Sequence, residues 1–459
     1  MVYPVSPALT LQYDVLGRLT NLVDGVGQTR YSYANNRLAS EDGPWAEDTV
    51  SYRYQYAGPR GGLTLLQPNA SPWTQSYGYD AAERLTSVVS PGGAFGYAYD
   101  STRVALPGTL TLPNGATIAT SYDFMARLTN TTLRTSQQAV LNHHGYGYNA
   151  ASQRTSVTNL AGNTVGYTYD RIGQLTQASG KEAGGTTRLN EQFEYGFDDI
   201  GNRKSTGGRA SAVGSYTNNL LNQLTGRGVA PYVDVLGLAN PTTNVTVRVV
   251  GGSAYNADRK GEYFHCPLSV PNARAQYPQI EVKSLYGATQ TDTGRVFVPP
   301  AGEVFQHDAD GNLRADGRWT YTWDGENRLV QMIRDTDTPA GARQKLVFEY
   351  DHQGRRIRKQ FYTRSGSNWV EQRDTICLYE GWNVVAELDA NATNARLRTY
   401  VWGLDLSGTR QGAGGVGGLL WVNNYQTSYG GQTLPTGCST RSWTATGTWW
   451  GWRRRRTRR

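Results

Sequence analysis

The stretch Tyr77-Gly78-Tyr79-Asp80, which closes on Arg84-Leu85, is one copy of a phrase that recurs along this chain. The phrase consists of an aromatic residue, one intervening residue, a second aromatic, an Asp or Asn, and a turn that ends in Arg or Gln and then Leu. Other copies, some shorter, are Tyr13-Asp14 to Arg18-Leu19, Tyr122-Asp123 to Arg127-Leu128, Tyr167-Thr168-Tyr169-Asp170 to Gln174-Leu175, Tyr321-Thr322-Trp323-Asp324 to Arg328-Leu329, and Tyr350-Asp351 to Gly354-Arg355. Successive copies in the first half are 20 to 26 residues apart, measured over Tyr56, Tyr79, Tyr99, Tyr122, Tyr148 and Tyr169. That length fits two short strands and two turns, and such units bury their faces only by stacking on one another.

Alternate tyrosines define the expected local structure. In an extended strand every second side chain points to the same face, so Tyr77 and Tyr79 place both rings on one side. The Asp that follows is expected to accept hydrogen bonds from backbone N–H groups one or two residues on, which replaces the strand pairing that a turn lacks. Glycines such as Gly17 and Gly354 fall three residues after this Asp, where a left-handed backbone suits glycine. The pattern predicts a long antiparallel sheet in which Tyr rings form ladders and Arg side chains lie over them, each contact contributing roughly 0.5 to 1 kcal/mol.

The residues singled out by this pattern have a structural role in the prediction. They are Tyr13, Asp14, Gly17, Arg18, Tyr79, Asp80, Arg84, Tyr122, Asp123, Arg127, Tyr169, Asp170, Gly173, Trp323, Asp324, Arg328, Tyr350, Asp351 and Gly354. A glycosidase would need one special pair of carboxylates at a defined separation, whereas here the same Asp recurs at equivalent turns. We therefore predict no catalytic residues among them.

The recurring phrase resembles the Rhs or YD-repeat family, which is named for the Tyr-Asp pair. The resemblance covers about residues 11–228 and 304–402. It implies an all-β fold in which an antiparallel β-strand ribbon spirals into part of a hollow shell. In bacterial polymorphic toxins and insecticidal toxin complexes of this family, the shell encloses a toxic C-terminal domain. The resemblance also implies a secreted or cell-surface location, with the toxin domain or the remaining shell as partners.

The C-terminal part departs from the family pattern. In the family, a glycine-rich run such as the one that begins at Gly403 leads to the Rhs-associated core, which carries Tyr-Tyr-Asp-Pro and Asp-Pro-x-Gly signatures. This chain has no Asp-Pro pair, so we expect it to be truncated before the core and to lack the self-cleaving residues. Because Leu11 already enters a repeat, we also expect the chain to begin partway along a larger shell.

The chain is predicted to fall into five parts. Residues 1–228 form a first repeat block, 229–303 an inserted β-rich module, 304–402 a second repeat block, 403–422 a glycine-rich junction, and 423–459 a basic, Trp-rich tail. The insert lacks the Tyr-Asp phrase and shows short alternating stretches such as Asn244–Val250 and Gln279–Val282, which predict a small β-sandwich. It is interpreted either as a sugar- or protein-binding module or as a bare spacer, since fold alone does not assign function.

Composition supports strands and turns rather than helices: 459 residues include 54 Gly, 30 Tyr and 12 Trp but only 3 Met. No run of about 20 apolar residues predicts a membrane-spanning helix. The start, Met1-Val2-Tyr3-Pro4, does not have the pattern of a signal peptide.

The net charge of +8 comes mainly from the tail. Without Arg453–Arg456, Arg458 and Arg459, 39 basic residues face 37 acidic ones, a net charge of +2. From Asn423 on there is no Asp, Glu, Lys, Ile or Val, a composition that predicts disorder. The tail is interpreted either as a binder of nucleic acid or anionic membranes or, as we favour, as a product of translation that has left the ancestral frame.

No metal or cofactor site is predicted. Cys266, Cys377 and Cys438 lie far apart without CxxC spacing, and the pairs His143-His144 and His265-Cys266 lack the spacing of metal ligands. The run Asp308–Asn312 superficially resembles a calcium loop, but Trp319 occupies the place of the bidentate Glu, so a turn is expected.

Three functions are compatible with these features. The leading hypothesis is a non-enzymatic shell segment that, in an intact protein, helps to enclose and deliver a C-terminal toxin. The second is a secreted or cell-surface adhesin whose aromatic rings bind glycans. The third and weakest is nucleic-acid binding through the arginine tail.

Overall fold

The computed structural model describes residues 8–55, 58–67, 70–99, 106–208, 214–334, 338–425, 428–429, 432–433 and 437–439. Within these residues the elements are β-strands, joined by turns and accompanied by two short 3₁₀ turns, η1 (Ala340–Ala342) and η2 (Ala390–Ala392). Every strand pairing for which the register is given is antiparallel, for example β1 with β2 and β19 with β20. The predicted all-β fold built on a long antiparallel sheet is confirmed.

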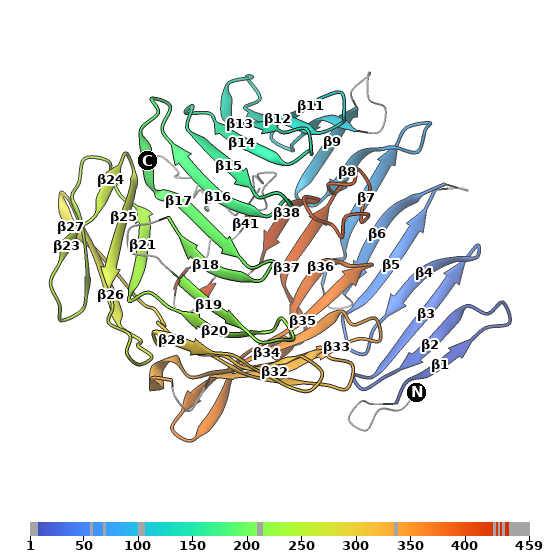
Figure 1. Ribbon diagram of the computed structural model, residues 1–459. Helices are drawn as coiled ribbons and strands as arrows, with labels where there is room; N and C mark the ends of the chain where they lie inside the picture. The colour runs from blue at the N-terminus through green and yellow to red at the C-terminus, as the bar shows by residue number, and fades with distance from the viewer. Residues whose placement is uncertain are drawn as a thin grey trace. The chain divides into compact units, whose positions relative to one another are not determined.

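The first repeat block forms a meander in which strands follow one another in chain order (Figure 1). One sheet of the described residues contains 21 strands, namely β1–β20 and β28. These strands are β1 (Thr10–Tyr13), β2 (Leu19–Val23), β3 (Gln28–Ala34), β4 (Arg37–Asp42), β5 (Thr49–Tyr54), β6 (Arg60–Leu66), β7 (Trp73–Tyr79), β8 (Leu85–Ser90), β9 (Gly93–Tyr99), β10 (Pro107–Thr111), β11 (Thr117–Tyr122), β12 (Leu128–Arg134), β13 (Val140–Tyr148), β14 (Arg154–Asn159), β15 (Thr164–Tyr169), β16 (Leu175–Lys181), β17 (Thr187–Phe197), β18 (Arg203–Gly207), β19 (Gly214–Asn218), β20 (Leu224–Gly228) and β28 (Gly302–Val304).

The second repeat block continues with a sheet of its own. The strands of this block are β29 (Gln306–His307), β30 (Leu313–Ala315), β31 (Thr320–Trp323), β32 (Leu329–Arg334), β33 (Gln344–Tyr350), β34 (Arg356–Ser365), β35 (Asn368–Glu380), β36 (Asn383–Asp389) and β37 (Ala395–Trp402). The same sheet is extended by β38 (Leu419–Asn424) and β41 (Gly437–Ser439), which lie beyond the block in the junction and the tail. A separate pair consists of β39 (Ser428–Tyr429) and β40 (Gln432–Thr433).

The chain divides into two compact units. The first gathers described residues from 1–165, 348–360 and 373–459, and the second gathers those from 166–347 and 361–372. In the first unit, strands from the two ends of the chain share one hydrophobic core. Side chains from β5–β9, such as Leu65, Trp73 and Phe95, pack in one cluster with side chains from β35–β38, such as Ile376 and Leu388. Burying each such side chain contributes roughly 1.5–3 kcal/mol to stability. The shared core thereby holds together two segments that are some 300 residues apart in sequence.

The second unit contains the insert, which is built from two small sheets. Its strands are β21 (Tyr232–Leu238), β22 (Val245–Val249), β23 (Tyr255–Asn256), β24 (Asp258–Lys260), β25 (Tyr263–Ser269), β26 (Gln279–Tyr286) and β27 (Ala288–Arg295). One sheet has the order β21-β25-β24 and the other β23-β22-β26-β27. Val247, Phe264, Leu268 and Ile280 belong to one buried cluster that draws on both sheets.

The repeat ladder continues directly across the insert. Strand β20, which precedes the insert, pairs with β28, which follows it, so that Gly228 lies opposite Gly302. The insert therefore leaves and rejoins the sheet at one point.

Part of the tail that starts at Asn423 falls among the described residues. Asn423 and Asn424 belong to β38 and lie opposite residues of β41. Sheet pairing thus extends past the boundary expected at Val422, while residues 440–459, with all the terminal arginines, lie outside the described residues. In the part of the chain that the structure describes, no helix has the length and hydropathy needed to cross a bilayer.

Candidate functional site

In five copies of the repeat, the recurring aspartate organises the turn through both carboxylate oxygens. Asp80 Oδ1 accepts hydrogen bonds from the backbone N–H groups of Ala82 at 3.0 Å and Arg84 at 2.9 Å, and Oδ2 accepts from Arg84 Nε at 2.7 Å. The same three contacts recur in the pairs Asp14–Arg18, Asp123–Arg127, Asp324–Arg328 and Asp351–Arg355. The Arg84 backbone N–H, together with the Arg84 side chain, holds the pKa of the Asp80 carboxyl below its usual value.

Glycine marks only some of these turns. Gly17, Gly173 and Gly354 have φ values of 74°, 90° and 79°. At the corresponding turns of other copies, Glu83 and Ala126 adopt φ values of 59° and 61°. The hydrogen bonds between the Asp and Arg of the turn thus hold these non-glycine residues in the left-handed conformation, which costs roughly 1–2 kcal/mol per residue. A search for glycine alone misses these copies.

Several turns that carry an arginine are also tied to the next hairpin, by a contact that we call the repeat clamp. The clamp is the stacking of the turn arginine on a tyrosine of the following hairpin, together with the hydrogen bond of that tyrosine to the strand after the turn. The guanidinium carbons of Arg18, Arg84 and Arg127 lie 4.6, 4.5 and 5.0 Å from the ring centroids of Tyr33, Tyr99 and Tyr148. The tyrosine hydroxyls donate to the carbonyls of Leu19, Leu85 and Leu128, each at 2.8 Å.

Other aromatic residues of the phrase make related contacts. Tyr79 Oη donates to the Arg60 carbonyl at 3.0 Å, Tyr122 Oη donates to the Pro107 carbonyl at 3.4 Å, and Trp323 Nε1 donates to the Leu313 carbonyl at 2.7 Å. Tyr13 differs, because its side chain is 57% exposed in the first described strand. The structure thus places most of the predicted repeat residues at the same kind of position, a turn or a contact between hairpins, rather than at one shared site.

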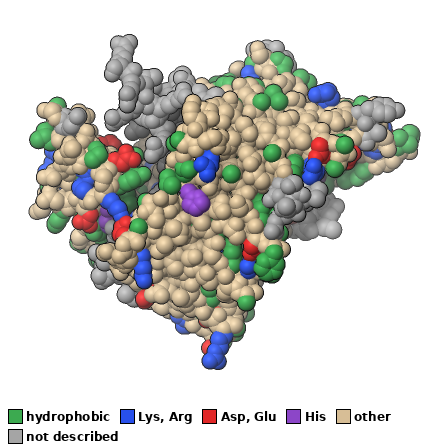
Figure 2. All heavy atoms as spheres, turned by 90° about the horizontal axis from the view of Figure 1, so that it is seen from above, with side chains coloured by type: hydrophobic (Ala, Val, Ile, Leu, Met, Phe, Trp, Pro, Cys, Tyr) green, Lys and Arg blue, Asp and Glu red, His purple; other side chains and the backbone are tan. Residues whose placement is uncertain are grey.

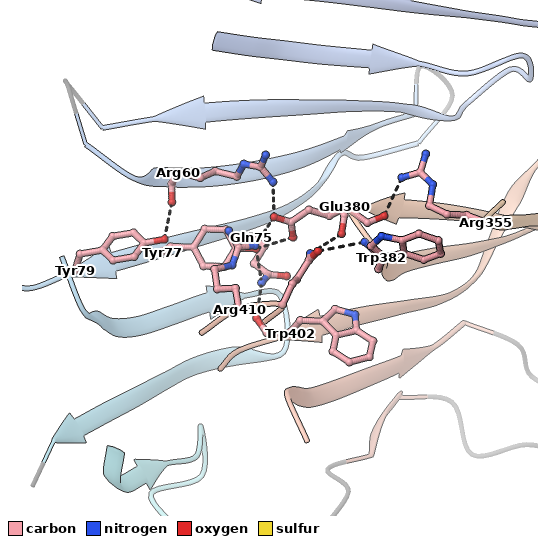
Figure 3. A network of polar contacts seen from close by, with 11 residues as sticks. Arg60, Gln75, Tyr77, Tyr79, Arg355, Glu380, Trp382, Trp402 and Arg410 are labelled. Carbon is pink, nitrogen blue, oxygen red and sulfur yellow. Dashed lines mark hydrogen bonds and ion pairs between the residues drawn. The ribbon is translucent and has the colours of Figure 1, made fainter. Parts of the chain in front are cut away.

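One polar cluster brings together residues that the sequence does not connect (Figure 3). Glu380 ends β35 with only 3% of its side chain exposed, and it forms ion pairs with Arg60 of β6 and with Arg410. Tyr77 Oη donates to Glu380 Oε2 at 3.3 Å, and the Arg410 guanidinium carbon lies 4.0 Å from the Tyr77 ring centroid. We call these four residues the Glu380 cluster. Its members come from β6, from β7, from the end of β35 and from the glycine-rich junction, and all of them belong to the first unit.

The glycine-rich junction supplies Arg410 from an ordered loop. Asp405 is the centre of this loop, because its carboxylate accepts from the backbone N–H groups of Ser407 at 2.9 Å, Ala413 at 2.6 Å and Gly415 at 3.2 Å. The loop is anchored to the first repeats where the Leu404 N–H donates to Tyr97 Oη at 3.1 Å. Gly403 is needed at this contact, since a Cβ there would lie 1.9 Å from Tyr97 Oη.

A small cavity of about 60 Å³ lies elsewhere in the first unit, with Glu41, Trp45, Asp48 and Arg355 among its lining residues. Asp48 Oδ2 accepts from the Trp45 N–H at 2.9 Å, while Oδ1 is buried and has no hydrogen-bond partner within the described ranges. Burial raises the pKa of Asp48 to about 7. The cavity has room for about two water molecules and is too small for a sugar ring.

The residues considered as metal ligands occupy ordinary structural positions. His143 Nδ1 lies 2.8 Å from Thr132 Oγ1, and His265 Nε2 lies 2.8 Å from Asp234 Oδ1. Cys266 and Cys377 are buried free thiols, and the side chain of Cys438 is outside the described part. Asp308 lies in the turn between β29 and β30, where Oδ1 accepts from the Asp310 and Asn312 N–H groups.

Charges do not gather into a single patch on the visible face. Figure 2 shows Lys and Arg side chains and Asp and Glu side chains scattered in small groups over the described part of this face. Many charges of the described residues are paired, as in the turn pairs of Asp80 with Arg84 and Asp123 with Arg127.

Sequence similarity to curated proteins is confined to a short stretch. The chain is 31% identical over 100 residues to the tRNA nuclease WapA of Bacillus subtilis strain 168, and 31% identical over 103 residues to the tRNA3(Ser)-specific nuclease WapA of Bacillus spizizenii. These stretches cover 21% and 22% of this chain, and the chain spans 4% of the length of each relative. No protein-family model matches the chain.

Several similar solved structures are toxin complexes. The TcdB2-TccC3-Cdc42 structure matches 97% of this chain and 23% of its own, with a TM-score of 0.40 and 12% identity. The Tc holotoxin pore of Photorhabdus luminescens matches 97% of this chain and 24% of its own, with a TM-score of 0.39 and 14% identity.

Proposed function

We propose that this chain is a non-enzymatic segment of an Rhs-type shell, whose role in the intact, secreted or surface-exposed protein is to help enclose and deliver a C-terminal toxin. The repeat clamp is the observation that carries this proposal. The turn arginines Arg18, Arg84 and Arg127 each stack on a tyrosine of the next hairpin, and that tyrosine hydrogen-bonds back to the strand after the turn. Each such contact needs only one further copy of the same hairpin. Adding copies therefore extends the sheet into a wall and does not build a pocket for a ligand.

The chemistry of the recurring turn also favours a structural role. A catalytic carboxylate needs access to a substrate and a pKa matched to its task. The carboxylate of Asp123 instead accepts three hydrogen bonds, two from Arg127 and one from the Met125 N–H. The curated relatives are nucleases by name, and this chain spans 4% of their length. We propose that it corresponds to a repeat segment of such proteins rather than to the nuclease, because its recurring carboxylates are hydrogen-bonded within turns.

Small-angle scattering and negative-stain electron microscopy of the purified chain test the proposal. A solid globule of this length would have a radius of gyration of about 23 Å. We expect a larger value and images of a curved or open ribbon. The replacement Arg127→Gln is a matched variant, because Gln174 stands at the equivalent turn position, and it should loosen the ribbon locally without unfolding the chain. Compact particles with a radius near 23 Å would overturn the proposal.

The two other functions lead to separate tests. An adhesin should bind specific sugars on a glycan array, and failure of a folded chain to bind any of them would contradict that function. Nucleic-acid binding through the tail should disappear, together with its salt dependence, when Ser442–Arg459 is deleted. Unchanged DNA retention by the shortened chain would exclude the tail.

A further inference from the structure

An open groove of about 520 Å³ lies in the second unit, where the insert meets the second repeat block. One wall belongs to the insert and consists of residues 276–278 together with Arg295, the last residue of β27. The other wall is formed by Pro339 and Gly341, at the 3₁₀ turn η1. Sites for small molecules typically have volumes of about 300–1,000 Å³ and often lie between modules. The groove therefore has the size and the place of a ligand site.

Both walls of the groove are held in place by the chain itself. Gln276 and Val298 exchange two backbone hydrogen bonds, of 2.8 and 2.9 Å, which fix the wall of the insert. In the other wall, the Ala342 N–H donates to the Pro339 carbonyl at 2.8 Å, and Ala342 is fully buried. Preformed walls reduce the entropy that binding costs.

The Tyr277 ring borders open space because residue 341 has no side chain. A Cβ at Gly341 would lie 3.3 Å from Tyr277 Cε1 and 3.4 Å from Cδ1, so a larger residue would take up the space beside the ring. Gly341 is not among the described glycines with a positive φ, so its backbone does not by itself require glycine. An aromatic ring that borders open space can pack against the apolar C–H face of a sugar.

Polar groups converge on the same place, and their charge is positive. Arg295 Nη1 donates to the Tyr277 carbonyl at 3.3 Å and Nη2 to Gln279 Oε1 at 3.2 Å, with the guanidinium carbon 5.9 Å from the Tyr277 ring centroid. Arg295 has no ion pair with a described residue, and no carboxylate is among the described residues of the lining. The Gln276 side chain donates to the Arg274 carbonyl at 3.3 Å, which leaves its amide oxygen to accept from a hydroxyl.

We propose that this groove binds an acidic sugar, whose ring packs against Tyr277 and whose carboxylate pairs with Arg295. An arginine can bind a carboxylate through two parallel hydrogen bonds, which gives both affinity and orientation. Gln276 accepts a hydrogen bond from a hydroxyl of the same sugar. A proline-rich peptide fits less well, because such peptides bind grooves lined by several aromatic residues, and Tyr277 is the one aromatic side chain in the described lining.

Ligand-observed NMR titration of the full chain tests the proposal. The probes are the methyl glycosides of glucuronic, galacturonic and sialic acid, with methyl glucoside and methyl galactoside as neutral counterparts. We expect saturable binding of at least one acidic glycoside, and roughly fivefold weaker binding of the neutral ones.

Two replacements locate the site. Gly341→Leu fills the groove and should abolish binding, whereas Gly184→Leu, where a Cβ meets no atom within 4 Å, should leave it unchanged. Arg295→Gln should remove the preference for the acidic glycoside. Its control is Arg314→Gln, which changes an exposed arginine of β30 outside the groove and should preserve the preference.

Several results would overturn the proposal. These are no binding of any acidic glycoside, equal affinities for acidic and neutral glycosides, binding that survives Gly341→Leu in a folded chain, or binding of a proline-rich peptide in place of the sugars. If Gly341→Leu folds poorly, hydrogen exchange of the unaltered chain decides the location, because a bound sugar should protect amides within 276–280 and 340–343. Absence of that protection would place the sugar elsewhere and refute the site. The site is independent of the shell function, since an open ribbon that binds no sugar would retain the one and refute the other.

Discussion

At the scale of single residues, the Glu380 carboxylate connects two parts of the chain that are far apart in sequence. Its buried side chain pairs with Arg60 from the first repeat block and with Arg410 from the glycine-rich junction. The hydroxyl of Tyr77 completes the Glu380 cluster. Two guanidinium groups therefore depend on one acid for neutralisation, in a place where burial makes an uncompensated charge costly.

Replacing Glu380 with Gln should lower the free energy of unfolding of the first unit by about 3 kcal/mol, because the arginines remain partly buried without their counter-charge. Chemical denaturation monitored by Trp fluorescence measures the loss. The replacement Glu83→Gln, at an exposed turn position, is the control and should change stability by less than about 0.5 kcal/mol. Equal denaturation midpoints for the two variants would contradict a central role for Glu380.

The buried carboxyl of Asp48 leads to a prediction of how the stability of the fold depends on pH. Its pKa is raised from 3.8 to about 7, so the unfolded chain ionises this group before the folded chain does. Its effect on stability is therefore absent below about pH 4, and stability is lost as the pH rises from about 4 to about 7. Asp48→Asn should remove this loss, because an amide oxygen still accepts from the Trp45 N–H.

The variant should accordingly be more stable than the natural chain at pH 8 and similar to it at pH 4. Each pKa unit corresponds to about 1.4 kcal/mol, so the gain at pH 8 is at most about 4 kcal/mol. Thermal unfolding at the two pH values measures it. Asp80→Asn is the contrasting variant: the pKa of Asp80 is lowered, so its removal should reduce stability at pH 8. A gain from Asp48→Asn that is equal at both pH values would refute the ionisation argument.

At the scale of elements, the glycine-rich junction is a loop held in one conformation by its own hydrogen bonds and by its contact with β9. Asp405 gathers three backbone N–H groups, and Gly403 brings the backbone against Tyr97 of β9. The loop thereby sets the position of Arg410, which has its guanidinium over Tyr77. A segment whose composition is typical of a flexible linker is thus an ordered part of the first unit.

Gly403→Ala should therefore destabilise the loop, because the new Cβ would lie 1.9 Å from Tyr97 Oη. Tyr97→Phe removes that oxygen, so the double variant should recover part of the loss, and the coupling energy should be about 1 kcal/mol. Hydrogen exchange of residues 404–418 reports the local effect. Gly184→Ala, where a Cβ meets no atom within 4 Å, is the control. Strictly additive effects of the two replacements would show that this contact does not limit the loop.

The sequence predicts the repeats well because their determinants are local. Asp80 and Arg84 are four residues apart, and the spacing that reveals them is also the spacing at which they hydrogen-bond. The Glu380 cluster could not be predicted in this way, since Arg60 and Glu380 are 320 residues apart and nothing near either one marks the other. Positive φ angles at Glu83 and Ala126 were equally hidden, because neither residue type indicates such a conformation.

At the scale of the whole molecule, the pairing of β20 with β28 makes the insert separable from the ladder. Joining Gly228 to Gly302 through an Asn-Gly turn would remove the insert and close a simple hairpin, because these glycines already lie opposite each other. We expect the shortened chain to fold, with hydrogen-exchange protection of β16–β20 retained. The ion pair of Lys260 with Glu182 would be lost, but Lys260 is largely exposed and such pairs contribute little.

Loss of protection throughout β16–β20 in the shortened chain would contradict this expectation. A comparison shortening, in which an Asn-Gly turn replaces residues 160–163 between β14 and β15, should have little effect on the same strands, since it keeps the two strands joined as a hairpin. Comparing the two shortened chains distinguishes an effect of losing the insert from an effect of altering the repeat sheet itself.

The pairing of β20 with β28 also has a consequence for how such chains can diversify in evolution. A module that enters and leaves at one hydrogen-bonded pair of strands is a cassette, and recombination at its borders can replace it without disturbing the repeats on either side.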